Sequence, residues 1–276
     1  MKKKKMITKK DLMLCEKMTE EEIPNLVGDY QANIKYDGER LAVIKHGEDI
    51  FLLNRSGREK SFIYPELYEE FKKVKGNFVL DGEVVTTDYL FNTLQHRVNL
   101  GKREKINEAI TKYPIRYVAF DILFFANEDL RMKPLKQRVE YLNGFKNETK
   151  DLIIDIAEYG EINEMLARAK ADDGEGILVK NMNGFYEGRR SKNWLKLKLF
   201  KQADITISSY ALNNAGIRCE DNEGNAVQIS GNQHYEVKDI LDKIGYADIV
   251  CQYLEKTKNG RLRFISYVGL KWMNMK

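Results

Sequence analysis

The chain has 276 residues, of which 43% are hydrophobic, enough to build one large or two modest globular domains. Its formal net charge of +4 is compatible with a nucleic-acid partner only if the positive charges gather on one face. The lysine run at 2–5 lacks the apolar core of a signal peptide, and no stretch is long enough to span a membrane. We therefore expect a cytoplasmic protein, in which Cys15, Cys219 and Cys251 are reduced, mostly packed thiols rather than zinc ligands.

The first part of the chain is predicted to change from an extended lead-in to a β-rich block. Residues 1–28 are polar and charged, and Pro24 and Gly28 interrupt them, which predicts an extended segment with a short helix. Apolar and polar residues then alternate, which favours antiparallel strands. These strands are expected at 30–35, 41–45 and 50–53, with a turn at 46–49.

A reactive lysine is predicted where the first of these strands ends. In the segment Ile-Lys-Tyr-Asp-Gly-Glu-Arg, at 34–40, Lys35 is our candidate nucleophile. A lysine amine attacks near neutral pH when desolvation or neighbouring cations disfavour its ammonium form. Gly38 allows the backbone to turn or to approach a ligand closely, and Arg40 supplies a fork for phosphate or carboxylate oxygens. Taken alone, the heptapeptide fits a solvated strand end equally well.

The middle of the chain alternates predicted helices and strands. The helix at 91–109 is expected on the surface, with Arg97 among its cations. Residues 181–193 are expected to form a loop. The other helices are expected at 65–74, 133–145 and 162–170, and the strands at 78–85, 115–125, 152–157, 177–180 and 194–199.

Several polar side chains on these strands are suited to bind a nucleotide. Asp81 and Glu83 should share one face of their strand, where a carboxylate can accept ribose hydroxyls or help hold a metal. Glycines flank Glu175, whose carboxylate could bind Mg²⁺ directly or through water. Lys196 and Lys198 should point the same way, neutralise phosphate charge and depress the pKa of Lys35.

Five segments resemble, in their order, the nucleotide-pocket motifs of the covalent nucleotidyltransferases, the superfamily of DNA ligases, RNA ligases and mRNA-capping enzymes. The first is K-x-D-G-x-R at 35–40, and the others lie at 80–85, 117–123, 173–180 and 194–198. The resemblance covers nearly the whole chain. It implies an α+β fold, with a nucleotidyltransferase (ATP-grasp-like) domain of antiparallel sheets and flanking helices at 1–200. A C-terminal OB-fold β-barrel is expected at 201–276, where strands at 204–210, 226–229, 248–254 and 261–267 accompany a helix at 237–244.

The resemblance also implies an ATP-dependent DNA ligase that seals nicks through a lysine-AMP intermediate. Phe120 could be plain core, but an aromatic residue at its place stacks on the purine in the family. Mg²⁺, with Mn²⁺ as a substitute, would be held by Glu175 and Glu83. The implied catalytic residues are Lys35, Asp37, Lys196 and Lys198. The implied nucleotide-binding residues are Ile34, Lys35, Arg40, Arg55, Glu83, Phe120, Glu175, Lys196 and Lys198.

The resemblance implies nicked duplex DNA as the partner, and we expect the protein to be a monomer. The OB domain is expected to move about a hinge at 200–203. DNA would be held by a small latch within 91–112 or 181–193, or by an accessory protein. The residues expected to contact nucleic acid are Arg55, Arg58, Arg189, Arg190, Lys256, Lys258, Arg261 and Arg263.

Two positions depart from the family pattern. Many DNA ligases carry a glutamate that reads adenine two positions before the nucleophile, whereas this chain has Asn33. Lys271 replaces the usual arginine of the last motif, and no acid follows it, so self-adenylylation could be slow. An RNA ligase or guanylyltransferase on the same fold, and a non-catalytic nucleic-acid-binding protein, are the alternatives. NAD⁺ is disfavoured because the chain lacks the cysteines and the extra domain of NAD⁺ ligases.

Overall fold

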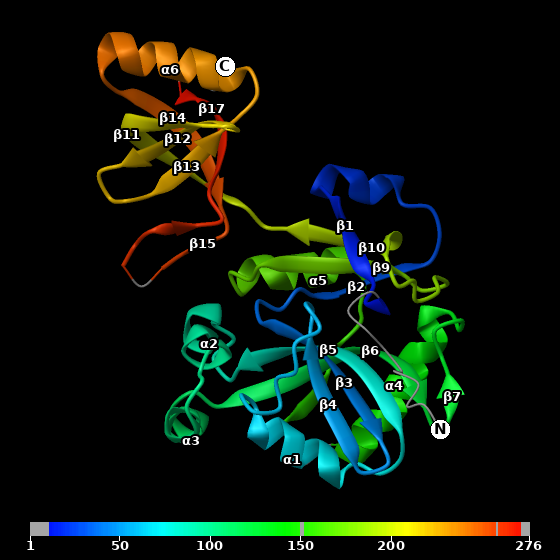
Figure 1. Cartoon of the computed structure of the whole chain (residues 1–276). Coiled ribbons are helices and arrows are strands. Elements are labelled where there is room, and N and C mark those ends of the chain that lie inside the picture. The colour runs from blue at the N-terminus through cyan, green and yellow to red at the C-terminus, as the bar shows by residue number, and fades with distance from the viewer. Residues whose placement is uncertain (1–10, 150–151, 258, 272–276) are drawn as a thin grey trace. The chain divides into compact units, whose positions relative to one another are not determined.

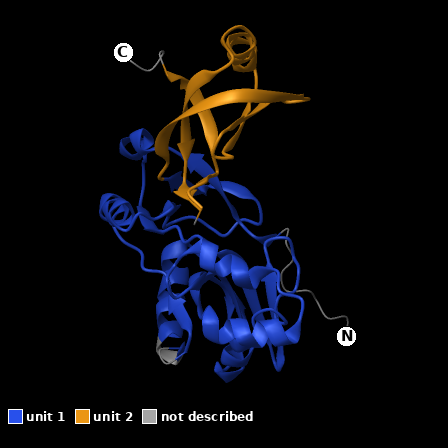
Figure 2. Ribbon diagram, turned by 90° about the vertical axis from the view of Figure 1, so that its left-hand side faces the viewer, with its two compact units in different colours: residues 1–198 blue, residues 199–276 orange. Residues whose placement is uncertain are grey.

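The computed structural model describes residues 11–149, 152–257 and 259–271. They divide into unit 1, Met1–Lys198, and unit 2, Leu199–Lys276 (Figure 2). The predicted domain boundary, between 200 and 201, lies two residues beyond this division. None of the helices in the described ranges is long and apolar enough to cross a lipid bilayer.

A six-stranded sheet forms the larger part of unit 1 (Figure 1). Its strands alternate as predicted: Leu41 and Val43 face one hydrophobic cluster, whereas Ala42 and Ile44 face another. The first cluster packs the sheet against helices α1 (Pro65–Lys73), α2 (Phe91–Val98) and α4 (Leu135–Thr149). The strand order is β4 (Asp49–Asn54), β3 (Glu39–His46), β5 (Phe78–Thr86), β6 (Ile115–Phe125) and β7 (Glu128–Asp129), with β8 (Ile154–Ile156) parallel to β6.

A four-stranded sheet completes unit 1, and the second hydrophobic cluster lies between the two sheets. Helix α5 (Ile162–Ala171) packs against β2 and β9 of this sheet. Its strand order is β1 (Leu14–Met18), β10 (Arg190–Lys198), β9 (Gly176–Asn181) and β2 (Tyr30–Ile34), with β1 parallel to β10 and the other pairs antiparallel.

Strand β1 and the helical region 91–109 differ from their predictions. Strand β1 lies in the segment predicted as an extended lead-in, where the short helix is the 3-10 helix Glu20–Asn25. The helical region 91–109 is two helices, α2 and α3 (Arg103–Lys112), and Arg97 is not a surface cation. Its side chain is fully buried. The cost of burying the charge is offset by hydrogen bonds from the guanidinium to the carboxylate of Glu66, at 2.5 Å, and to the carbonyl of Tyr113, at 2.9 Å.

Unit 2 is an antiparallel five-stranded sheet with helix α6 (Gln233–Ile244) and its own apolar core. Strand β12 was not predicted. Residues 201–203, predicted as a hinge, pair with β14 of the same unit, which leaves Leu199 and Phe200 before the sheet begins. The strand order is β13 (Ala226–Ile229), β12 (Gly216–Asp221), β11 (Lys201–Asn213), β14 (Ala247–Tyr253) and β17 (Ser266–Leu270), and a separate hairpin joins β15 (Glu255–Lys256) to β16 (Leu262–Arg263).

Candidate active site

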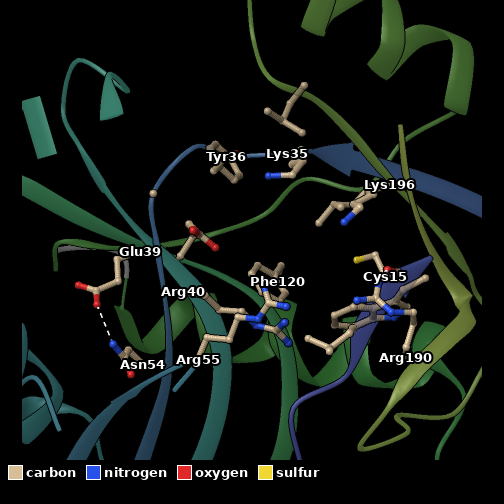
Figure 3. A pocket seen from close by; sticks show the side chains of 16 residues that line it. Cys15, Lys35, Tyr36, Glu39, Arg40, Asn54, Arg55, Phe120, Arg190 and Lys196 are labelled. Carbon is tan, nitrogen blue, oxygen red and sulfur yellow. Dashed lines mark hydrogen bonds between the residues drawn. The ribbon is translucent and has the colours of Figure 1, made fainter. Parts of the chain in front are cut away.

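A cavity of about 330 Å³ opens between the two sheets of unit 1. Its volume lies at the lower end of the range for small-molecule sites, roughly 300 to 1,000 Å³. Lys35 and Lys196 approach it from one side, and Arg55 and Arg190 from the opposite side (Figure 3). The predicted site residues that line the cavity are Ile34, Lys35, Arg40, Arg55, Glu83, Phe120, Arg190 and Lys196.

Lys35 is held at the rim of this cavity by strand β9 and by a carboxylate. Its backbone N–H donates to the carbonyl of Gly176 at 2.9 Å, directly after β2 ends. Its ammonium group pairs with one oxygen of Glu175, and Lys198 pairs with the other oxygen at 2.7 Å. Because the Glu175 side chain is only 8% exposed, this carboxylate fixes two lysines at one point of the site.

Two glycines allow the strands around Lys35 to approach closely. A Cβ on Gly38 would collide with the carbonyl of Val84 and the side chain of Glu83. At Gly176 a Cβ would collide with the carbonyl of Leu197, and the φ of +137° is itself a conformation that favours glycine. At Gly38 and Gly176 the close backbone approach is to neighbouring strands, and the approach to a ligand stays a prediction.

The charges around Lys35 raise its pKa, so the predicted depression by Lys196 and Lys198 is wrong. Burial is the largest single effect and lowers the pKa, but the carboxylates of Glu175, Glu83 and Asp37 together outweigh it. The sequence argument weighed the cations on β10 and omitted the acids that face them. In this structure Lys35 is therefore an ammonium group held in an ion pair.

Glu83 and Glu175 differ in their suitability to hold a metal ion. Burial raises the pKa of Glu83 to about 8, with Lys35 and Arg40 opposing the shift, so a cation at this carboxylate would stabilise its charged form. Both oxygens of Glu175 are taken by lysines. Within the described ranges, no three His, Cys, Asp or Glu side chains converge to form a metal site. The residues present thus fit a metal at Glu83, and at Glu175 only after a lysine leaves.

Arg40 lines the cavity, but its fork is occupied. Nε and Nη2 donate to the two oxygens of Asp81 at 2.8 and 2.6 Å, and Nη1 donates to the carbonyl of Met13 at 2.8 Å. The hydroxyl of Tyr186 also donates to Asp81, at 2.6 Å. The fork thus binds a carboxylate, one of the two partners predicted for it, and in this structure it is not open to a phosphate. The exposed Arg55, just after β4, lies beside the same cavity.

Phe120 is both a core residue and a wall of the cavity. It is 4% exposed and meets the Trp194 ring edge to face, with centroids 5.9 Å apart. Lys180, which the sequence analysis did not single out, lies against both rings at 4.2 Å from Trp194 and 4.7 Å from Phe120. Its ammonium group donates to the hydroxyl of Tyr159 at 2.7 Å. A lysine ending an apolar strand was the sequence signal that could have revealed it.

Residues 12–198, which include this whole cavity, match the model of one protein family, the ATP-dependent DNA ligase domain. The chain belongs to this family. The DNA ligase of Sulfolobus acidocaldarius is 31% identical over 215 residues, which are 71% of this chain and 35% of that ligase. The chain therefore spans about a third of the length of the curated DNA ligases that it matches.

Solved structures of DNA ligases share the fold. A Lig E DNA ligase aligns with a TM-score of 0.68 at 17% identity, over 94% of this chain and 98% of that one. The mycobacterial DNA ligase D complexed with ATP and MES aligns with a TM-score of 0.59 at 21% identity, over 94% of each chain. At these identities the likeness concerns the fold alone.

The residues predicted to contact nucleic acid differ in their exposure and in whether they form ion pairs. Arg55 and Arg58 are exposed in the turn after β4, where the Asn54 side chain accepts the Arg58 N–H at 3.0 Å. Arg189 pairs with Glu187 at 2.8 Å, whereas Arg190 turns into the cavity and donates to the carbonyl of Cys15, a cavity residue that was not predicted. Lys256, Arg261 and Arg263 belong to the β15–β16 hairpin, Arg263 pairs with Glu255, and Lys258 lies outside the described residues.

The two positions that depart from the ligase pattern each have a hydrogen-bond or ion-pair partner within their own unit. Asn33 is fully buried, and its amide donates to the carbonyl of Ile34 at 2.8 Å. Lys271 lies 3.1 Å from Asp204 within unit 2, and residues 272–276 of the predicted last motif lie outside the described residues. Asp37 lies close enough to Lys35 to raise its pKa.

The buried Lys180 predicts a pH dependence of stability in this ligase domain. Burial lowers its pKa from 10.5 to about 8, so between these values the unfolded chain binds more protons than the folded one. The free energy of unfolding should therefore gain up to about 3 kcal/mol from this group as pH rises from 8 to 10.5. In urea titrations at pH values across this range, the free energy of unfolding of wild type should rise relative to that of Lys180→Met. Parallel curves would contradict the assignment.

Proposed function

We propose that this chain is an ATP-dependent DNA ligase that seals nicks in duplex DNA through a lysine-AMP intermediate. The observation that carries the proposal is the placement of Lys35 at a cavity of a DNA ligase domain, where Glu175 binds both Lys35 and Lys198. An arrangement of one lysine nucleophile, two further lysines and a carboxylate suits transfer of a nucleotidyl group.

The reaction consists of three displacements at phosphorus. The ammonium group of Lys35 first releases a proton to solvent, and the neutral amine then attacks the α-phosphorus of ATP. The bond to pyrophosphate breaks, and the nitrogen loses a second proton. The 5′-phosphate at the nick then attacks the same phosphorus and takes the AMP from Lys35. Finally the 3′-hydroxyl attacks the activated 5′-phosphate, loses its proton and expels AMP.

Residues that line the cavity, together with Glu175 and Lys198 beside Lys35, would supply positioning and charge for these steps. Glu175 orients the nitrogen of Lys35, and Lys196 and Lys198 would neutralise charge on the α-phosphate. Phe120 offers an aromatic wall for the adenine, and Glu83 a carboxylate for a ribose hydroxyl. Mg²⁺, or Mn²⁺ in its place, would be held by Glu83 and would stabilise the negative charge that develops on the phosphates.

Unit 2 is proposed to be an OB-fold domain that grips DNA. In support, the chain forms three strands of the antiparallel sheet, then α6, and then the remaining two strands, which fits a five-stranded OB barrel. Lys256, Arg261 and Arg263 of the β15–β16 hairpin, with Arg55 and Arg58 of unit 1, would contact phosphates. The domains would then be 1–200 and 201–276, in a cytoplasmic monomer acting alone or with an accessory protein on nicked DNA.

Sealing of a singly nicked DNA duplex tests the proposal. With ATP and Mg²⁺ we expect full-length product, and with GTP, or without nucleotide, none. Lys35→Ala should not seal the nick with ATP. Lys170→Ala is its matched control, because Lys170 is exposed on α5 and pairs with Glu20 rather than with a cavity residue. Sealing only of nicked RNA would favour an RNA ligase, and transfer only from GTP a guanylyltransferase. Nicked-DNA binding without any nucleotidyl transfer would favour the non-catalytic module.

A further inference from the structure

A stacked pair of tyrosines lies beside the candidate nucleophile. Tyr36 follows Lys35 in the chain and lines the cavity. Its ring stacks on that of Tyr89, with centroids 6.0 Å apart and planes inclined by 29°. Tyr89 itself does not line the cavity, and it is 51% exposed, followed by Leu90 at 56%. The aromatic surface of the cavity thus continues outward onto the rim.

The backbone presents Tyr89 in a conformation that tyrosine rarely adopts. Its φ is +56°, in the left-handed region, where a bulky side chain is strained. Hydrogen bonds hold the turn: Asp88 accepts from the Thr86 hydroxyl at 2.6 Å and from the Leu90 N–H at 3.0 Å, and the Tyr89 N–H donates to the Thr86 carbonyl at 2.9 Å. A glycine at this position would avoid the strain. Because the Tyr89 ring is half exposed, packing in the core does not explain the tyrosine, and we look for a binding role.

The charges near the pair favour a base over a phosphate as its ligand. The nearby cations are Arg116 and Arg168, and each already has an acidic partner: Asp155 accepts from Arg116 at 2.7 Å, and Glu158 from Arg168 at 2.8 Å. The surface around the two rings is therefore aromatic with its charges paired. Exposed aromatic faces of this kind stack on unpaired or terminal nucleobases.

We propose that Tyr89, backed by Tyr36, stacks on a nucleobase of the DNA at the nick and thereby positions the end that receives AMP from Lys35. This inference rests on the proposed ligase function. Adenine of ATP is the less suitable occupant, because Tyr89 lies outside the cavity and Phe120 and Trp194 already provide aromatic groups within it. Tyr89 would be a positioning residue for the DNA substrate.

Three variants test the role of the ring. Tyr89→Gly removes it and suits the positive φ, so the fold should be kept, with a melting temperature at or above that of wild type. Tyr89→Phe keeps the ring. Phe51→Ala removes an exposed ring from β4 and serves as the control. For sealing of nicked DNA that already carries AMP on its 5′-phosphate, we expect Tyr89→Gly to raise KM about 10-fold or more, and the other two to leave it near wild type.

A base analogue provides a second readout. Nicked DNA with 2-aminopurine as the base next to the 5′-phosphate of the nick should lose fluorescence on binding to wild type and Tyr89→Phe, and keep it with Tyr89→Gly. Equal KM and equal quenching for wild type and Tyr89→Gly would overturn the inference, as would a loss confined to the reaction with ATP. Failure of the proposed function would look different, because wild type itself would then neither accept AMP nor seal.

Discussion

Replacing Lys35 by alanine is expected to abolish transfer of AMP from ATP to the protein, with a loss on the order of 10⁴-fold or more. Lys35 is the lysine that Glu175 and the carbonyl of Gly176 hold at the cavity rim. Lys198 binds the other oxygen of Glu175, so the variant also tests whether Lys35 alone of these two lysines accepts AMP. Radiolabelled ATP, followed by electrophoresis of the denatured protein, measures the transfer.

A second substrate separates loss of the nucleophile from loss of the fold. Lys35→Ala should still seal a nick that already carries AMP, at a measurable rate, because a 3′-hydroxyl rather than a lysine is the nucleophile in that step. Lys170→Ala should label with AMP as wild type does. Labelling of Lys35→Ala at the wild-type rate would show that another residue accepts AMP.

Asp81→Asn is expected to lower the free energy of unfolding by about 3 to 5 kcal/mol. Asp81 is fully buried, and its two oxygens accept hydrogen bonds from the guanidinium of Arg40 and the hydroxyl of Tyr186. An amide of almost the same shape removes the negative charge and leaves the buried guanidinium without its counter-ion. Chemical denaturation followed by circular dichroism gives the change.

Two further variants show whether the unpaired charge causes this loss. Asp129→Asn removes a similar carboxylate from the exposed Arg131 pair and should cost less than about 1 kcal/mol. Combining Asp81→Asn with Arg40→Met removes both charges and should recover part of the stability. Equal losses of stability in Asp81→Asn and Asp129→Asn would contradict the claim that the unpaired, buried guanidinium of Arg40 causes the loss.

Most strands of unit 1 could be predicted because their pattern is local. Strands β3 and β5 alternate between two cores, and β6, predicted at 115–125, has these bounds in the structure. Strand β1 could not be predicted in this way, since its five residues pair in parallel with β10, more than 170 positions further along the chain. Such pairing leaves no pattern within a short window of sequence.

The residue types of the site could be predicted, but not the balance of charges among them. The resemblance of the motifs to those of the nucleotidyltransferases predicted that Lys35, Glu83, Phe120 and Lys196 share one pocket, and all four line the cavity. The contact between Lys35 and Glu175 joins residues 140 positions apart, and it decides that the pKa of Lys35 is raised. Only the fold reveals which acids face which cations.

Mass spectrometry of the protein after incubation with ATP and Mg²⁺, without DNA, tests the central claim most directly. The intact protein should gain the mass of one AMP, and fragmentation of its peptides should place the group on Lys35. Once ATP is removed, the gain should disappear when nicked DNA is added, because AMP then passes to the 5′-phosphate. Protein that remains unmodified by ATP, or that carries AMP on a different lysine, would contradict the assignment of Lys35 as the nucleophile.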